Sequence, residues 1–256
     1  MILRIEDVSF SYPSAAALDG ITLHVSRGEV VAIVGKNGAG KSTLLRCINH
    51  IITPTAGSVY VNERNIEKVS FLERARIIGY LSQKSEHVFP MSVFEVVLMG
   101  RYPYSPYRFS KHDEEIVAGI LSRMGLGSLA NRTFDRLSGG EQQQVLIARA
   151  LAQETDVILF DEPTNNLDLQ HQLEVMQLIR RIAKDEGKTA LIAIHDLNLG
   201  ASFADRVIII HQKKIYSAGT PMEVFTEETL SQVFGVSVKI YNHGGIPHIV
   251  TVAPIS

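Results

Sequence analysis

The sequence predicts an α/β fold built around a mostly parallel sheet. Three short apolar runs carry this prediction: EVVAIVG, which ends at Gly35, DVILFDE, which ends at Asp161 and Glu162, and TALIAIHD, which ends at His195 and Asp196. Continuous rather than alternating runs are typical of strands that helices cover on both faces. Open parallel sheets place their sites at the carboxyl ends of strands, and all three runs end in residues able to do chemistry.

The remaining elements are expected around these strands. Apolar stripes at helical spacing predict one helix through Ile116–Met124 and another from Leu169 to about Ala183, with Gly187 as its stop. Strands of a more antiparallel flank are expected in ILRIEDVSFSYP and ITLHVSRGEV, and a hairpin in GSVYVNERNI. The stretch from Phe71 to Ala150 reads as mostly helical, and the segment after Pro221 as a small helix-and-strand appendix.

Composition limits the kind of protein. The 256 residues are 45% apolar and 20% charged, with a net charge of −2, so no broad basic surface indicates a nucleic acid partner. No apolar run approaches the roughly 20 residues that span a bilayer. The single Cys47 excludes an internal disulfide and is expected to pack in the core, which favours a reducing cytoplasmic compartment.

A phosphate-binding loop follows the first apolar run. GKNGAGKS, Gly35 to Ser42, matches G-x-x-x-x-G-K-[ST] in full, between a strand and a helix. Backbone amides of such a loop and the positive end of the helix bind phosphate oxygens, Lys41 reaches the β- and γ-phosphates, and Ser42 is a magnesium ligand. The expected nucleotide contacts are Gly35, Asn37, Gly38, Ala39, Gly40, Lys41, Ser42 and Thr43.

The acidic end of the second apolar run supplies a further magnesium ligand and a group that can act on water. Asp161 suits the coordination of magnesium, and Glu162 can position or deprotonate a water that attacks the γ-phosphate. The alternative is a strand that simply ends in solvated acids, and the complete phosphate loop elsewhere in the chain disfavours it. The chemistry is therefore expected to be nucleoside-triphosphate hydrolysis with ATP and Mg²⁺.

A second loop, LSGGE, holds Ser138, Gly139 and Gly140 before a predicted helix. Ser138 and Glu141 fit a capping box, which does not account for two consecutive glycines. A capped helix start with exposed amides is also an anion site. Because one triphosphate is already wrapped by the first loop, the second loop is useful if it covers the γ-phosphate bound by a second copy of the chain.

The order of these elements resembles the ATP-binding cassette (ABC) ATPases over nearly the whole chain. The resemblance implies a P-loop NTPase (RecA-like) core with an N-terminal antiparallel β subdomain and a helical subdomain. It divides one ABC ATPase domain into a core at about 1–83 and 155–220, a helical subdomain at about 84–154 and an appendix at about 221–256. It also implies a dimer with two ATP molecules between the copies.

The resemblance assigns roles to further residues. Tyr12 matches the aromatic that stacks on adenine, and Gln83 the glutamine that contacts magnesium and the attacking water. Asp168 matches the aspartate that crosses the dimer interface, although it also suits a helix N-cap. His195 matches the histidine that contacts the γ-phosphate and organises Glu162. One departure is Gln144, where relatives often carry a basic residue.

Two shorter stretches indicate which subgroup of ABC ATPases the chain resembles. VFEVVLMGRYPY and EETLSQVFGVSV look like the ATPases of importers for iron-siderophores, haem and cobalamin. Ser92 and Glu95 form a capping box that predicts a helix from about Val93 to Gly100, followed by a proline- and aromatic-rich surface suited to a protein partner. The resemblance implies separate permease subunits, an extracytoplasmic substrate-binding protein and a peripheral place on the cytoplasmic face of the inner membrane.

Other readings remain. His243 and His248 could suggest a metal, but no cysteine or acidic partner has ligand spacing, and His211 is expected in a surface hairpin. A soluble ABC ATPase of iron–sulfur cofactor assembly would share every catalytic residue, differing only in the region from Lys84 to Phe109. A DNA-associated ABC ATPase is disfavoured, because the chain has no long heptad insertion and no basic stripe.

Overall fold

A six-stranded sheet forms the centre of the computed structural model, which describes residues 1–82 and 90–255. The strand order is β10-β9-β3-β8-β7-β6, with β10 antiparallel to β9 and the other pairs parallel. The strands are β3 Val30–Val34, β6 Ile78–Leu81, β7 Val157–Asp161, β8 Thr189–Ala193, β9 Arg206–His211 and β10 Lys214–Gly219. The mostly parallel sheet predicted from the three apolar runs is confirmed.

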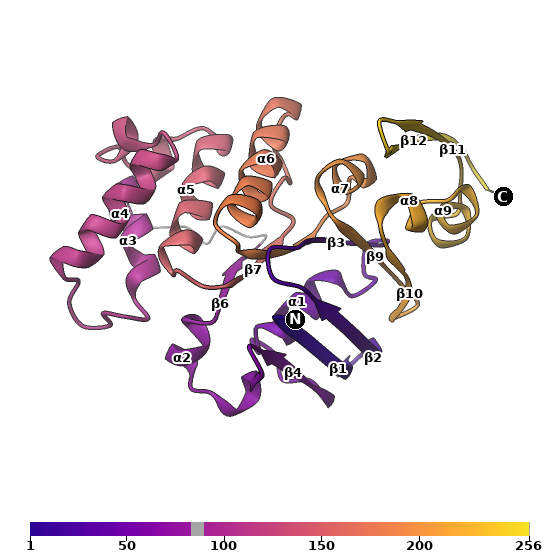
Figure 1. Cartoon of the computed structure of the whole chain (residues 1–256), viewed down its shortest axis with the longest axis horizontal. Helices are drawn as coiled ribbons and strands as arrows, with labels where there is room; N and C mark the ends of the chain where they lie inside the picture. The colour runs from indigo at the N-terminus through magenta and orange to yellow at the C-terminus, as the bar shows by residue number, and fades with distance from the viewer. Residues whose placement is uncertain (83–89, 256) are drawn as a thin grey trace.

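Alternate residues of the central strands enter two separate cores. In β3, Val30, Ala32 and Val34 pack among the helices, whereas Val31 and Ile33 face the N-terminal strands. Strands β7 and β8 divide in the same way. Figure 1 shows helices α3 to α6 on one side of the sheet and the N-terminal strands with α1 on the other. Burial on both faces explains why these runs are continuously apolar.

The N-terminal flank is a four-stranded antiparallel sheet of order β2-β1-β4-β5. Its strands are β1 Leu3–Tyr12, β2 Ala15–Val25, β4 Ala56–Val61 and β5 Arg64–Asn65. Helix α1, Lys41–Ile48, buries Leu44, Leu45, Cys47 and Ile48 between this flank and the central sheet. The expected packing role of Cys47 is therefore confirmed, and burial raises the pKa of its thiol to about 12.

Helices α3 Val93–Leu98, α4 Lys111–Arg123, α5 Gly139–Ala152, α6 Leu169–Asp185 and α7 Leu197–Phe203 cover the opposite face. The short helix α2, Phe71–Ala75, buries none of its residues and lies near the end of α1 and the edge strand β6. Short 3₁₀ turns span Ile66–Lys68, Met99–Arg101, Gly127–Leu129 and Phe134–Arg136. The capping box of Ser92 and Glu95 is present, and α3 ends two residues before the predicted Gly100 because the chain tightens into a 3₁₀ turn.

Two strands depart from the expected layout. Strand β6 lies inside the stretch from Phe71 to Ala150 that was expected to be mostly helical, and it pairs with β7 at the edge of the central sheet. Strand β9 lies in the interior of the same sheet beside β3, although it was not among the three runs assigned to it. Four residues are too few to show a period, so β6 becomes visible only through its pairing with β7.

The C-terminal segment packs beside α7 as helices α8, Pro221–Val224, and α9, Glu227–Phe234, and a hairpin of β11, Val236–His243, and β12, Ile246–Pro254. The side chain of Asn198 in α7 donates to Ile249 O at 3.1 Å and accepts from Ile249 N at 2.8 Å, which joins α7 to β12. The expected helix-and-strand appendix is confirmed. Within residues 1–82 and 90–255, no helix has the length and apolarity that crossing a membrane requires.

Candidate nucleotide site

The first loop joins β3 to α1 and is shaped by glycines. Gly35 has φ +155°, and a Cβ there would lie 2.4 Å from Ile210 O. Gly40 has φ +110°, and a Cβ there would lie 2.7 Å from Ala17 O. Both positions therefore exclude a side chain for two reasons: the backbone conformation and the close approach of another carbonyl. The loop is held in one curved path directly before the helix.

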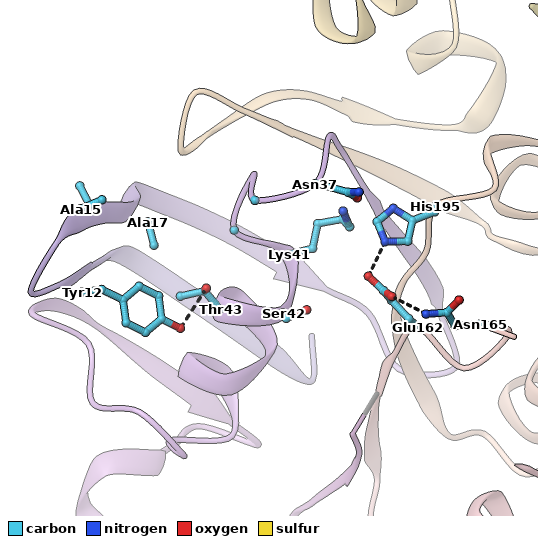
Figure 2. A pocket seen from close by; sticks show the side chains of 13 residues that line it. Tyr12, Ala15, Ala17, Asn37, Lys41, Ser42, Thr43, Glu162, Asn165 and His195 are labelled. Carbon is cyan, nitrogen blue, oxygen red and sulfur yellow. Dashed lines mark hydrogen bonds and ion pairs between the residues drawn. The ribbon is translucent and has the colours of Figure 1, made fainter. Parts of the chain in front are cut away.

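Lys41 lies at the centre of this curve. Lys41 is only 5% exposed, and its Nζ donates to Gly35 O at 2.9 Å and to Lys36 O at 3.3 Å. Burial lowers the pKa of Lys41, while the nearby Glu162 and Asp161 oppose that shift. Figure 2 shows the ammonium pointing into the cavity toward His195 and Glu162. A cation held by two loop carbonyls in this place is ready to receive phosphate oxygens.

The oxygen atoms of Ser42 and Asp161 meet below the loop. Ser42 Oγ donates to Asp161 Oδ1 at 2.6 Å, and Tyr80 Oη donates to Asp161 Oδ2 at 3.0 Å. Burial and the charge of Asp161 raise the pKa of Tyr80 to about 12, so the phenol remains a donor at neutral pH. Magnesium prefers oxygen ligands, and this hydroxyl–carboxylate pair beside a phosphate loop fits that preference.

Glu162 is the one acidic side chain among the described residues that line the cavity. Its φ of +55° is unusual for a residue with a side chain, and its N donates to Ala193 O at 3.0 Å. One carboxylate oxygen, Oε1, forms a short hydrogen bond with His195 Nε2. The other, Oε2, accepts from Asn165 Nδ2 at 3.2 Å. Residues at the ends of β7 and β8 thus hold one carboxylate in a single orientation (Figure 2).

The cavity has a volume of about 810 Å³ and brings together most of the residues expected at the first loop. It is lined by Tyr12, Ala15, Ala16, Ala17, Asn37, Gly38, Gly40, Lys41, Ser42, Thr43, Glu162, Asn165 and His195. Tyr12 lies at the end of β1, where its hydroxyl is 3.4 Å from Thr43 Oγ1. Gly35, Ala39 and Asp161 are not among the lining residues and shape or support the loop from behind.

Sequence reasoning missed several residues of this site. Asn165 has a signal in retrospect, because it follows Glu162 by three residues at a strand end. Tyr80 belongs to β6, which was not recognised as a strand of the sheet. Ala15, Ala16 and Ala17 line the cavity through their position in β2, and alanine carries no chemical signal from which such a role could be inferred.

The second loop lies apart from this cavity. Ser138 is the N-cap of α5, with Oγ accepting from Glu141 N at 3.3 Å and its own N donating to Glu141 Oε2 at 2.8 Å. The backbone N–H and the hydroxyl of Ser138 both donate to Glu141 Oε2, and these two hydrogen bonds hold the pKa of Glu141 below its ordinary value. None of Ser138, Gly139 and Gly140 is among the described residues that line the cavity. The capping box is confirmed, and the second loop takes no part in the cavity that the first loop forms in the same chain.

Asp168 serves as the N-cap of α6. Its Oδ1 accepts from His171 N at 2.9 Å and lies 2.7 Å from His171 Nδ1. The N-cap alternative for this residue is therefore confirmed within one chain, while its expected place across a dimer interface stays a prediction. Gln83, the expected magnesium-contacting glutamine, lies outside the described residues.

The remaining expectations concern three histidines, the aromatic stretch after α3 and Gln144. His243 and His248 form a ring contact at 6.0 Å, and no group of three possible metal ligands occurs in the described parts of the chain. His211 lies in the β9–β10 hairpin against Tyr216, as expected. The aromatic stretch after α3 is only partly a surface: Tyr107 is fully exposed, but Tyr104 turns inward to donate to Gln153 O. Gln144 Nε2 donates to Glu174 Oε2 at 3.5 Å.

Known proteins resemble this chain over nearly its whole length. A family model described as ABC transporter matches residues 18–165. The uncharacterized ABC transporter ATP-binding protein MJ0089 of Methanocaldococcus jannaschii is 44% identical, with 98% of each chain covered. The hemin import ATP-binding protein HmuV of Thermobifida fusca is 39% identical, covering 98% of this chain and 89% of the relative. The ferric enterobactin transport ATP-binding protein FepC of Escherichia coli is 36% identical, covering 97% and 93%.

Solved structures agree in fold. A proposed metal-chelate type ABC transporter in an inward-facing conformation gives a TM-score of 0.86 at 29% identity, covering 98% of this chain and 97% of that chain. The dimeric ATP-binding cassette MJ0796, in a post-hydrolysis state with ADP and Pi, gives 0.75 at 29% identity, covering 86% and 99%. With a matching family model, relatives above 30% identity and the predicted loops all in agreement, the chain belongs to the ABC transporter family as an ATP-binding subunit, a class that hydrolyses ATP to drive transport.

Proposed function

We propose that this chain energises an importer for iron-siderophore, haem or cobalamin-type substrates, as two copies that close around two ATP molecules. The observation that carries the dimer is the separation of the two loops: one cavity holds Lys41, Glu162 and His195, while Ser138–Gly140 cap a helix elsewhere. The named import roles of HmuV and FepC support the substrate class, and the dimeric cassette with ADP and Pi supports the assembly.

The chemistry assigned to each residue follows from its place in the cavity. The amides of the first loop and Lys41 bind the phosphates, and Tyr12 stacks on the adenine. Ser42 and Asp161 would hold magnesium, which lowers the negative charge of the phosphate oxygens when it is bound. Glu162 orients the attacking water and accepts its proton, and Asn165 and His195 hold that carboxylate toward the γ-phosphate.

The partners belong to the same proposal. A second copy contributes Ser138, Gly139, Gly140 and Asp168 to the nucleotide, and separate membrane subunits receive the ATP-driven movement. An extracytoplasmic substrate-binding protein delivers the cargo on the other side. The chain itself would lie at the cytoplasmic face of the inner membrane, attached through those membrane subunits.

The decisive variant is Glu162→Gln. Loss of a general base slows a reaction by about a hundredfold or more, so ATP turnover should fall at least that far. ATP binding should persist, and with Mg²⁺ the chain should become a dimer by light scattering. Glu228→Gln, a change in an exposed glutamate of α9, is the matched control and should behave as the parent. A Glu162→Gln chain that stays monomeric with ATP and Mg²⁺ contradicts the proposal.

A further inference from the structure

The second glycine of the LSGGE loop is held in a close contact with a histidine of the neighbouring helix. A Cβ built on Gly140 would lie 2.1 Å from His171 Cδ2 and 2.7 Å from Nε2, so the imidazole occupies the space of a side chain. Gly139 differs, because a Cβ there would meet only Leu167 Cδ2 at 3.8 Å. Neither residue has a positive φ. Packing against His171, and not backbone conformation, therefore disfavours a side chain at residue 140.

The same imidazole is bound on its other side. His171 Nδ1 lies 2.7 Å from Asp168 Oδ1, the carboxylate oxygen that also caps α6. The side chain of His171 is about one-third exposed, and its ring thus reaches from the Asp168 loop to the first turn of α5. Two segments 28 residues or more apart in the chain meet through one planar ring.

We propose that His171 is a positioning residue that fixes Ser138–Gly140 and Asp168 relative to each other, so that both meet a second copy as one rigid surface. The inference rests on the proposed dimer, because these are the residues assigned to the partner's nucleotide. Holding both loops in place before the copies meet removes ordering entropy that the dimer would otherwise have to offset. His171 does not line the nucleotide cavity of its own chain, so it acts through the loops and not on ATP.

The first test uses the Glu162→Gln chain as the parent. Adding His171→Ala should raise the dissociation constant of the ATP-dependent dimer about tenfold, the usual size of a coupling between contacting residues. The affinity of each monomer for ATP should change less than about twofold, since the ring lies outside that cavity. Gln177→Ala, an exposed position of α6, is the matched control.

The outcomes separate two failures. If the parent does not dimerise, the proposed function fails. If the parent dimerises and His171→Ala dimerises equally well, only the role of His171 fails. A purely structural His171 would lower the melting temperature without moving the dimer dissociation constant, and that result also overturns the inference.

A second test asks why residue 140 is glycine. Gly140→Ala should push the ring aside and weaken the dimer, and adding His171→Ala should make room, so that the double variant dimerises as tightly as His171→Ala alone. Gly119→Ala in α4, where a Cβ meets nothing within 4 Å, is the control. If the double variant loses as much as both single losses combined, the ring is not what excludes a side chain, and the inference is wrong.

Discussion

Tyr12 lines the part of the cavity where the proposed function places the adenine, and two contacts hold its ring. Its ring lies edge-on to Phe10 at 4.9 Å, and its hydroxyl is 3.4 Å from Thr43 Oγ1. The residue is 39% exposed and lines the cavity. The Phe10 contact and the hydroxyl thus hold the ring from its side and its end, which suits stacking on a base.

Replacing Tyr12 separates the ring from its hydroxyl. Tyr12→Ala should weaken ATP binding by about tenfold or less, because aromatic pairs contribute about 0.5–1.5 kcal/mol beyond area burial. Tyr12→Phe should bind within about twofold of the parent, since a 3.4 Å contact is a weak hydrogen bond. Fluorescent nucleotide titration of the monomer measures both. A Phe variant as weak as the Ala variant would show that the hydroxyl, not stacking, matters.

The residues of the site were predictable where chemistry and spacing coincide. Lys41, Ser42 and Glu162 stand in patterns that few other functions produce, and the structure gathers them at one cavity. His171 was not found, because its role depends on the distance to Gly140 across two helices. Contacts between side chains far apart in sequence leave no local pattern, and therefore sequence reasoning cannot reach them.

At the scale of elements, continuous apolar runs predicted the central sheet because both faces of it are buried. The expected stripe of α6 held only in part: Met176 and Ile179 are buried, whereas Leu169 and Leu173 are exposed. Those two leucines follow Asp168, on the part of α6 nearest the proposed dimer surface. Helical spacing identifies a face of a helix, but not what covers that face along its length.

The start of α4 is tied to the rest of the helical layer by a buried ion pair. Arg101 Nε donates to Asp113 Oδ1 at 2.9 Å, and Arg101 Nη1 donates to Ala152 O at 2.7 Å and Glu154 Oε2 at 2.6 Å. Burial opposes ionisation of Asp113, but hydrogen bonds from Ser110, Arg101 and Ser105 outweigh it and hold the pKa of Asp113 well below its ordinary value of 3.8.

Asp113→Asn should cost about 3 kcal/mol of unfolding free energy, because it removes a partner from a buried arginine. Because the folded-state pKa is lowered, the carboxylate stabilises the fold fully above about pH 5 and loses this effect as the pH falls below 3.8. The difference between parent and variant should therefore shrink between pH 5 and pH 3 in urea unfolding. Glu114→Gln, its exposed neighbour, is the control. A difference that stays constant over this range contradicts the ionised pair.

At the scale of the whole molecule, Ser138–Gly140 do not line the nucleotide cavity of their own chain, and the proposed dimer would bring those of a second copy to it. A shared site predicts that two differently damaged chains can repair each other. In the Glu162→Gln background, Lys41→Ala removes the cation of the first loop, and Ser138→Arg blocks the second. Neither chain should form an ATP-dependent dimer with itself, although the Ser138→Arg monomer should still bind ATP.

Mixing the two chains should restore one complete site, because the heterodimer pairs the intact first loop of one copy with the intact second loop of the other. Affinity capture of one tagged chain should then retain the other only when ATP and Mg²⁺ are present. A chain that carries both Lys41→Ala and Ser138→Arg, mixed with the parent, is the matched control, since neither site of that heterodimer is complete. Two loops that acted within one chain would leave the first mixture as unpaired as this control, so capture in the first mixture alone identifies a site shared between copies.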